Sequence, residues 1–223
     1  MRDHVIPETG AKRTLLEAAE RLFAEHGFDG VSVRDITQLS KANVAAVHYH
    51  FGNRDGLVRL VMLRHLVPVN EERLARLEAA ERKSPKAVPV EELLEAWLRP
   101  VLTASRKSEL EAGTAYKLIG RIFATGIEDL PATDSEPIRQ AQERFSRAFA
   151  KALHSVAADE LASRLHFVNG ALIHLLTHPS TAGETSREAT LGRLIRFAAA
   201  GMREGTEVDA KPKDKGAQAT FGF

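Results

Sequence analysis

The chain contains no cysteine, which excludes disulfide bonds, cysteine-ligated zinc, iron–sulfur clusters and a thiol nucleophile. No run approaches the roughly 18 apolar residues that a membrane-spanning helix needs. The N-terminus also lacks an apolar stretch of signal-peptide length. These absences predict a cytoplasmic protein that makes no membrane contact.

Neither sign of charge dominates, because 31 Lys and Arg residues stand against 30 Asp and Glu residues and leave a formal net charge of +1. The two signs balance even within residues 1–60. A strongly basic domain would itself be evidence for nucleic-acid binding. Any contact with nucleic acid must therefore depend on where a few groups are placed rather than on bulk charge.

The sequence also lacks a phosphate-binding loop, a nucleophile elbow, a pair of catalytic carboxylates and a zinc-binding helix motif. His48 and His50 are two residues apart and diverge on a helix, so they do not form a metal pair. His174 and His178 could face one ion, although solvated histidines are also common near a helix end. We therefore expect no enzymatic activity, no cofactor and no resident metal.

Apolar residues recur at helical spacing along almost the whole chain, and no strand pattern or internal repeat is present. The expected fold is therefore all-α. Gly27 ends a first helix, Ser32 caps a second and Asn43 caps a third. A long helix begins near Arg54, and Pro68 should kink or break it, because proline lacks an N–H and clashes with the preceding turn.

Beyond Pro68, the heavily charged segment that ends at Arg82 is expected to be solvated on most sides. The chain from about 207 to 223 is rich in Lys, Gly and Ala and has little to bury, so we expect it to be disordered. Further helices are expected at about 90–106, 110–125, 136–157, 159–178 and 186–204.

Two short amphipathic helices meet within residues 33–51. The second should hold Val44, Val47 and Phe51 inward, and it ends in the sequence His-Tyr-His-Phe. A short helix that presents ring donors and small alanines on one side fits a DNA major groove. This segment is the most informative part of the chain, and it predicts a DNA-binding regulator.

Six stretches carry a resemblance to a known family: Leu15–Phe23, Gly27–Phe28, Val31–Val33, Asp35–Ile36, Val44–Phe51 and Arg54–Leu57. They resemble the DNA-binding half of TetR-type transcriptional regulators, over about residues 12–62. A looser likeness, at Arg164–Leu172 and Arg196–Arg203, is to members of that family that respond to fatty acids or acyl ligands.

The resemblance implies an N-terminal three-helix helix-turn-helix domain and a larger C-terminal helical domain for ligand binding and dimerisation. It implies a homodimeric repressor that a small apolar effector, of the acyl or fatty-acid type, releases from a double-stranded DNA operator. The alternative is a helical regulator that acts through protein partners without an effector. The implied boundaries are 1–11 for a flexible N-terminus, 12–66 for the DNA-binding domain, 67–206 for the effector and dimerisation domain and 207–223 for a disordered tail.

The chain departs from the family pattern at three positions. Asn43 stands where Ser is common, and it caps a helix equally well. Arg54 replaces the usual Lys and keeps a charge that could fork onto a phosphate. Lys41 stands where the turn usually has Gly, and a left-handed residue other than Gly costs about 1 kcal/mol.

Helix N-termini favour phosphates because their N–H groups are free and the helix dipole is positive there. Arg34 could instead be an ordinary solvated charge, and Tyr49 could pack under its helix. The residues expected to contact the DNA backbone are Ser32, Arg34, Asn43, Tyr49, His50 and Arg54, and those expected to meet bases are Ala45, Ala46 and His48.

The C-terminal half holds most of the larger rings, and the resemblance implies an apolar effector pocket among them. Arg121 is the candidate contact for a carboxylate or thioester headgroup. The rings could equally be plain core, and Arg121 could be exposed or paired within the chain. The predicted effector contacts are Trp97, Tyr116, Arg121, Phe123, Phe145 and Phe149.

Two apolar stripes near the C-terminus have the spacing of helices that pack against other helices. The partner helices could belong to a second chain, as in a dimeric four-helix bundle, or to the core of a single chain. The predicted dimer contacts are Leu161, Leu165, Val168 and Leu172 in one helix, and Leu191, Leu194, Ile195 and Ala198 in the next.

Overall fold

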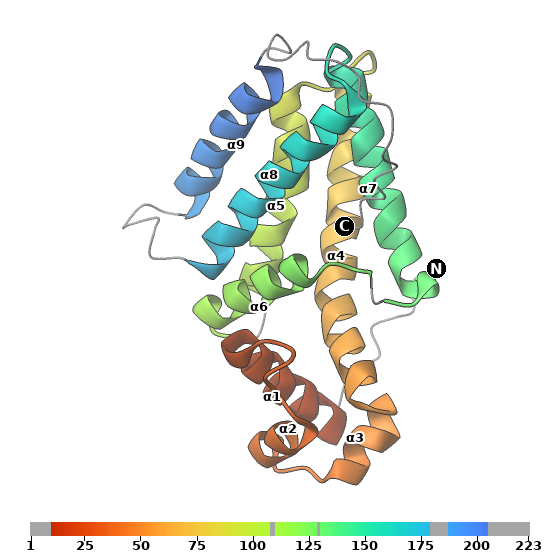
Figure 1. The fold of residues 1–223 in the computed structure, drawn as a ribbon, viewed down its shortest axis with the longest axis vertical. Helices are drawn as coiled ribbons and strands as arrows, with labels where there is room; N and C mark the ends of the chain where they lie inside the picture. The colour runs from red at the N-terminus through yellow and green to blue at the C-terminus, as the bar shows by residue number, and fades with distance from the viewer. Residues whose placement is uncertain (1–9, 108–109, 129, 179–186, 205–223) are drawn as a thin grey trace, which may run out of the picture.

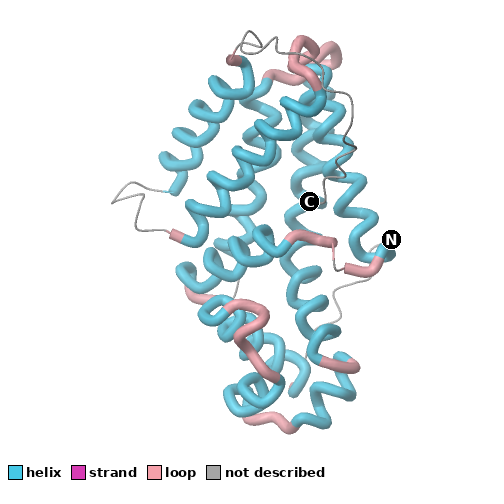
Figure 2. Tube along the Cα trace, in the orientation of Figure 1, coloured by secondary structure: helices cyan, strands magenta, loops and turns pink. Residues whose placement is uncertain are grey.

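The computed structural model describes residues 10–107, 110–128, 130–178 and 187–204. Within these residues the regular secondary structure is entirely α-helical, which confirms the predicted all-α class (Figure 2). The predicted disordered tail and nearly all of the predicted flexible N-terminus lie outside the described residues. The helices are α1 (Ala11–His26), α2 (Val33–Ser40), α3 (Val44–Phe51), α4 (Arg54–Lys83), α5 (Val90–Lys107), α6 (Ala112–Thr125), α7 (Ala132–Ala152), α8 (Ala158–Thr177) and α9 (Arg187–Arg203).

Helices α1, α2 and α3 form one end of an elongated molecule, and α4 runs from that end along the body formed by α5, α7, α8 and α9 (Figure 1). Helix α6 lies between α1 and the body. The apolar core of the α1–α3 end also contains Leu66 of α4 and Leu118 and Ile122 of α6. The two halves are therefore joined by shared core and not only by a linker. No described helix has the length and apolarity that a bilayer crossing requires.

Helix α2 begins with a capping box between Ser32 and Asp35. The Ser32 hydroxyl accepts the Asp35 backbone N–H at 3.3 Å, and the Asp35 carboxylate accepts the Ser32 backbone N–H at 2.8 Å. The Ser32 hydroxyl and then the Ser32 backbone N–H, which both donate to the Asp35 carboxylate, lower the pKa of that carboxyl below its ordinary value. The Asn43 carboxamide caps α3 by accepting the Ala46 N–H at 2.8 Å. Both predicted caps are confirmed.

Helix α4 continues through Pro68, so the predicted break at this residue is wrong, while the alternative of a kink stays a prediction. A proline inside a helix costs about 3 kcal/mol. Leu66 and Val69 beside it are buried, and each buried aliphatic side chain contributes roughly 1.5–3 kcal/mol. Pro68 itself is exposed, so the proline faces water. Burial on the opposite face thus outweighs the local defect, and the implied domain boundary falls inside one helix.

The predicted dimer contacts lie inside this chain. Seven of the eight are buried in the core of the body, and Leu165 packs against that core. Their 3–4 spacing describes packing of α8 and α9 onto their own neighbours, so the interpretation as an interface was wrong for these side chains. The exposed side of α8 and α9 carries other residues, among them Phe167 and Phe197.

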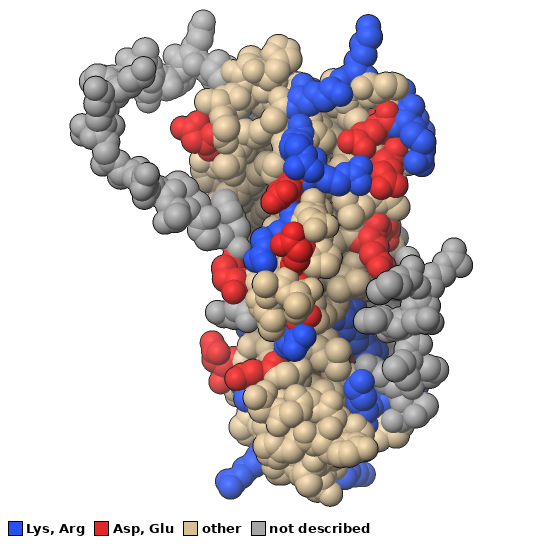
Figure 3. All heavy atoms as spheres, turned by 90° about the vertical axis from the view of Figure 1, so that its right-hand side faces the viewer, with Lys and Arg blue, Asp and Glu red and all other residues tan. Residues whose placement is uncertain are grey.

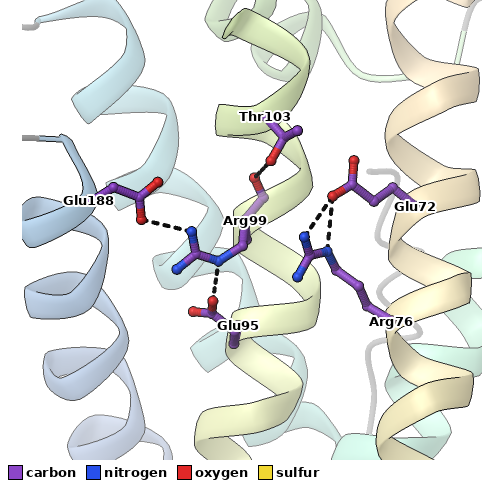
Figure 4. A network of polar contacts seen from close by, with 6 residues as sticks. All are labelled: Glu72, Arg76, Glu95, Arg99, Thr103 and Glu188. Atoms are coloured by element: carbon purple, nitrogen blue, oxygen red, sulfur yellow. Dashed lines mark hydrogen bonds and ion pairs between the residues drawn. The ribbon is translucent and has the colours of Figure 1, made fainter. Parts of the chain in front are cut away.

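Ion pairs tie neighbouring helices of the body together. Arg99 of α5 lies 2.7 Å from Glu188 of α9 and also pairs with Glu95 of its own helix (Figure 4). Arg144 of α7 lies 3.0 Å from both Glu78 and Glu81 of α4. Exposed pairs of this kind contribute at most about 1 kcal/mol each, so they set alignment more than stability.

Helix α1 is held to α4 by a buried polar contact between Glu20 and His65, with Glu20 Oε1 3.1 Å from His65 Nε2. We expect Glu20→Ala to lower the free energy of unfolding by about 1–3 kcal/mol, because it leaves a buried polar group without its partner. Glu17→Ala, which breaks only an exposed pair with Arg13, should cost less than about 0.5 kcal/mol. Urea denaturation measures both variants. Equal losses of the free energy of unfolding would contradict a stabilising role for the buried contact between Glu20 and His65.

Lys41 adopts the left-handed conformation, with φ 56° and ψ 27°, at the turn between α2 and α3. We expect Lys41→Gly to raise the free energy of unfolding by about 0.5–1 kcal/mol, because glycine relieves the Cβ strain. Lys41→Ala keeps the strain and should give no gain. Denaturation curves of both variants, measured side by side, test this prediction. Glycine and alanine variants of equal stability would rule out strain at this turn.

Candidate functional site

Helix α3 presents one exposed face at the end of the molecule, and α1 and α4 hold its other face. Val47 is fully buried and Phe51 is half-buried, so these two side chains anchor the helix. The opposite face exposes Ala45, His48 and Tyr49. This is the face that the sequence predicted for contact with bases and phosphates.

Two details of α3 differ from the prediction. Val44, the first residue of α3 and expected to face inward, is 43% exposed. Ala46, predicted to meet bases, is half-buried against the core of the α1–α3 end. The exposed face of α3 therefore includes Val44 and only part of Ala46.

His48 is oriented by a hydrogen bond within the helix end. Its Nδ1 lies 2.9 Å from the carbonyl oxygen of Gly52, the residue that ends α3. Because a carbonyl oxygen only accepts, Nδ1 must carry the hydrogen, and neutral His48 presents Nε2 as an acceptor. The exocyclic amines of adenine and cytosine are the donors of the major groove.

Tyr49 is 85% exposed, and its ring meets that of His50 edge-on, with centroids 4.9 Å apart. The alternative that Tyr49 packs under its helix is therefore wrong. Arg34 on α2 is likewise exposed. Both side chains have the reach and freedom that contacts to a DNA backbone require.

The hydroxyl of Ser32 and the guanidinium of Arg54 are already engaged within the chain. The Ser32 hydroxyl lies 2.6 Å from Asp35 Oδ2, so a phosphate at this helix end must compete with a carboxylate. Arg54 Nε donates to the carbonyl of Val31 at 2.9 Å, and another of its nitrogens donates to the carbonyl of Phe28. Arg54 thus braces the α1–α2 connection against α4, which contradicts the free phosphate-binding group that the sequence predicted.

Few charged side chains lie at the α1–α3 end, and those in view on one of its sides are basic (Figure 3). On the face drawn in Figure 3, acidic and basic side chains mix over the upper part of the molecule. The lower end, which holds α2 and α3, shows basic side chains at its edges and no acidic ones in view (Figure 3). This matches the expectation that placement, not bulk charge, would carry any contact with DNA.

Two adjoining cavities, each partly open to solvent, lie among the helices of the body. The outer cavity, of about 510 Å³, lies between α7 and α8 and reaches Trp97 of α5. The inner cavity, of about 370 Å³, is bordered by α4, α5, α6, α7 and α8. They share four lining residues, so the two cavities adjoin each other. The shared residues are Trp97, Gln142, His166 and Asn169.

Four of the six predicted effector contacts line these cavities, namely Trp97, Phe123, Phe145 and Phe149. Tyr116 lines neither and is buried in the core of the body. Arg121 also lines neither cavity, so its prediction as a headgroup contact was wrong.

Arg121 instead caps the C-terminal end of α1. Its Nε donates to the carbonyl of Ala24 at 3.1 Å, and its Nη2 donates to that of Glu25 at 3.2 Å. A guanidinium satisfies such free carbonyls and favours the negative end of the helix dipole. Arg121 thus links α6 to the α1–α3 end.

Arg73 of α4 is the cavity residue that the sequence interpretation missed. It lies in the segment expected to be solvated, yet it is only 2% exposed and lines the inner cavity. The sequence did indicate a buried position for Arg73. Arg73 shares one face of α4 with four apolar residues that are buried, namely Leu66, Val69, Leu77 and Ala80.

His174 and His178, left open as a metal pair, stack with ring centroids 4.5 Å apart and are both exposed. Among the described residues, no group of three or more potential metal ligands comes together there or elsewhere.

Comparisons with known proteins agree with this arrangement. Residues 15–61 match the family model described as bacterial regulatory proteins, tetR family, and residues 95–201 match the tetracyclin repressor-like C-terminal domain. The HTH-type transcriptional repressor Rv3405c of Mycobacterium tuberculosis is 48% identical over 48 residues, which are 22% of this chain and 26% of that protein.

The HTH-type transcriptional repressor AcnR of Corynebacterium glutamicum is 37% identical over 49 residues, which are 22% of this chain and 26% of that protein. The chain thus matches about a quarter of the length of these relatives. The TetR family transcriptional regulator PfmR from Thermus thermophilus shares the fold, with a TM-score of 0.56 and 18% identity over 86% of this chain and 98% of that one. Because the two family models together span both halves of the chain, it belongs to the TetR family of DNA-binding regulators of transcription, which are not enzymes.

Proposed function

We propose that this protein is a homodimeric repressor that binds an operator through α3 and leaves it when a small effector enters the cavities of the body. The exposed face of α3, with Ala45, His48 and Tyr49 held outward by buried Val47, is the observation that carries the proposal. Binding to chromosomal DNA would place the protein in the cytoplasm. In this proposal the domains divide at about residue 66, inside α4.

Each DNA contact has a distinct role in the proposal. His48 accepts from an exocyclic amine, and Ala45 and the exposed part of Ala46 allow close approach or contact thymine methyls. Phosphates are bound by Arg34, Tyr49 and His50 and by the helix ends at Ser32 and Asn43, and they supply most of the affinity. Arg54 acts indirectly, by holding the α1–α2 connection.

The dimer interface is the outer side of α8 and α9. Phe167 and Phe197 are 70% and 77% exposed there, and an added Cβ at Gly170 or Gly201 would meet no atom within 4 Å. The two helices pack against each other along one edge of the body (Figure 1). A second copy of this face would bury both rings and bring the small residues into close contact.

The effector would act through α4 and α6. Both helices line the inner cavity, and both contact the α1–α3 end, α4 through His65 and α6 through Arg121. A ligand that moves either helix changes the position of α3 relative to its partner in the dimer. The two recognition helices must lie about one helical turn of DNA, ~34–36 Å, apart.

Selection from double-stranded DNA of random sequence, followed by titration at several salt concentrations, tests the DNA-binding role. His48→Ala should weaken binding about 5–150-fold and relax preference at one base pair. Arg34→Ala should weaken all sequences alike and reduce the salt slope by about 1. Arg147→Ala, an exposed arginine of α7, serves as the control that leaves binding unchanged. Affinity that does not fall between 50 and 200 mM salt would exclude a phosphate-driven contact.

Sedimentation velocity tests the interface. Phe197→Glu should convert the dimer to a folded monomer at micromolar concentration, because two carboxylates would face each other across the two-fold axis. Val67→Glu replaces another exposed apolar residue, on α4, and should leave the dimer intact. A Phe197→Glu variant that sediments as a dimer would show that the interface lies elsewhere.

A further inference from the structure

Arg73 places a positive charge in the interior without a negative partner. Its Nε donates to the carbonyl of Trp97 at 2.8 Å, and its Nη1 lies 3.4 Å from Asn70 Oδ1. Its Nη2 is buried and has no hydrogen-bond partner. Among the residues that the structure describes, no Asp or Glu pairs with this guanidinium.

The surroundings stabilise the cation only in part. The guanidinium carbon lies 3.7 Å from the centroid of the Trp97 ring and 5.2 Å from that of Phe123, so both rings present their faces to the charge. Burial lowers the pKa of Arg73 to about 9, which still leaves it protonated at neutral pH. A buried charge that is neither paired nor fully hydrogen-bonded is costly, and an arginine at such a position calls for an anion.

Arg73 is among the residues that line the inner cavity, and its Nη2 lies just beneath the surface of that lining. Asn70, Gln142 and Asn169 add side-chain amides to the same lining, and the Trp97 indole N–H donates to Asn169 Oδ1 at 2.8 Å. Phe123 and Leu66 supply apolar walls. Glu128 is the acidic residue of this lining, and it is exposed, so water screens its charge.

We propose that the cavities bind an organic monocarboxylate, with its carboxylate on Arg73 and its apolar body in the outer cavity beside Phe145 and Phe149. The planar fork of a guanidinium matches a carboxylate, and one buried cation balances one negative charge. The four shared lining residues place the two cavities side by side, and the proposed ligand extends from one into the other. This inference deepens the proposed function, because it gives the chemical class of the effector.

The test compares ligands that differ only in charge, on the full-length protein without DNA. Calorimetry and thermal shift measure binding of decanoate and 4-phenylbutyrate, with 1-decanol and decylamine as controls. We expect a carboxylate to bind about 10–100-fold more tightly than the alcohol, the range of a charge-assisted hydrogen bond. Trp97, the one tryptophan in the sequence, lies against Arg73 and adds a fluorescence signal from the site.

Arg73→Met removes the charge but keeps much of the volume, so it should fold. It should lose the preference for a carboxylate over the alcohol and should bind 1-decanol as well as the wild type does. Arg139→Met, at the rim of the outer cavity, should keep the preference. The proposal is overturned if neither carboxylate binds the wild type more tightly than the uncharged and cationic controls, or if Arg73→Met retains the preference. Because no DNA is present, these outcomes are independent of whether the protein regulates transcription.

Discussion

The unbroken course of α4 is the constraint on which the rest of the structure depends. Arg54 at its first turn braces the α1–α2 connection, His65 holds α1 through Glu20, and Arg73 lies in the inner cavity. Nineteen residues separate Arg54 from Arg73, which corresponds to about 28 Å along a helix. A single rigid element thus spans the distance from the DNA-binding end to the cavity, and Pro68 does not interrupt it.

Helix α6 gives the same two regions a second connection. Phe123 lines the inner cavity, and Arg121, half a turn earlier, caps α1. A ligand that favours one packing of α4 and α6 must therefore favour one position of the α1–α3 end. Coupling between two sites is reciprocal, so DNA that selects the other position must weaken the ligand by the same factor.

Local chemistry made the DNA-binding end predictable from sequence. The caps at Ser32 and Asn43 and the left-handed turn at Lys41 each follow from interactions between residues close in the chain. Long-range packing made the body harder to predict. The stripe from Leu161 to Leu172 has the spacing of helix packing, but spacing does not identify which chain supplies the partner. The predicted break at Pro68 was wrong because burial of the opposite face of α4 outweighs the local cost of a proline inside a helix.

Arg121 and Arg73 illustrate the same limit of prediction from sequence, which is that spacing alone does not identify the partner of a side chain. Both lie in helices with apolar neighbours, and only the fold decides that Arg121 reaches helix-end carbonyls and that Arg73 faces a cavity. The inward position of Arg73 could have been recognised from the helical face that it shares with Leu66 and Leu77. The cavity that Arg73 faces could not have been recognised from the sequence, because five helices that are distant in sequence form it.

The spacing of the two recognition helices tests the central claim most directly. The chain has no cysteine, so one cysteine introduced at exposed Gln38 of α2 carries a spin label without competition. Pulsed dipolar spectroscopy then measures the distance between the two protomers on selected DNA. We predict one narrow distribution that places the α3 helices ~34–36 Å apart. No distance between protomers, or one that two successive major grooves cannot accept, would contradict the account.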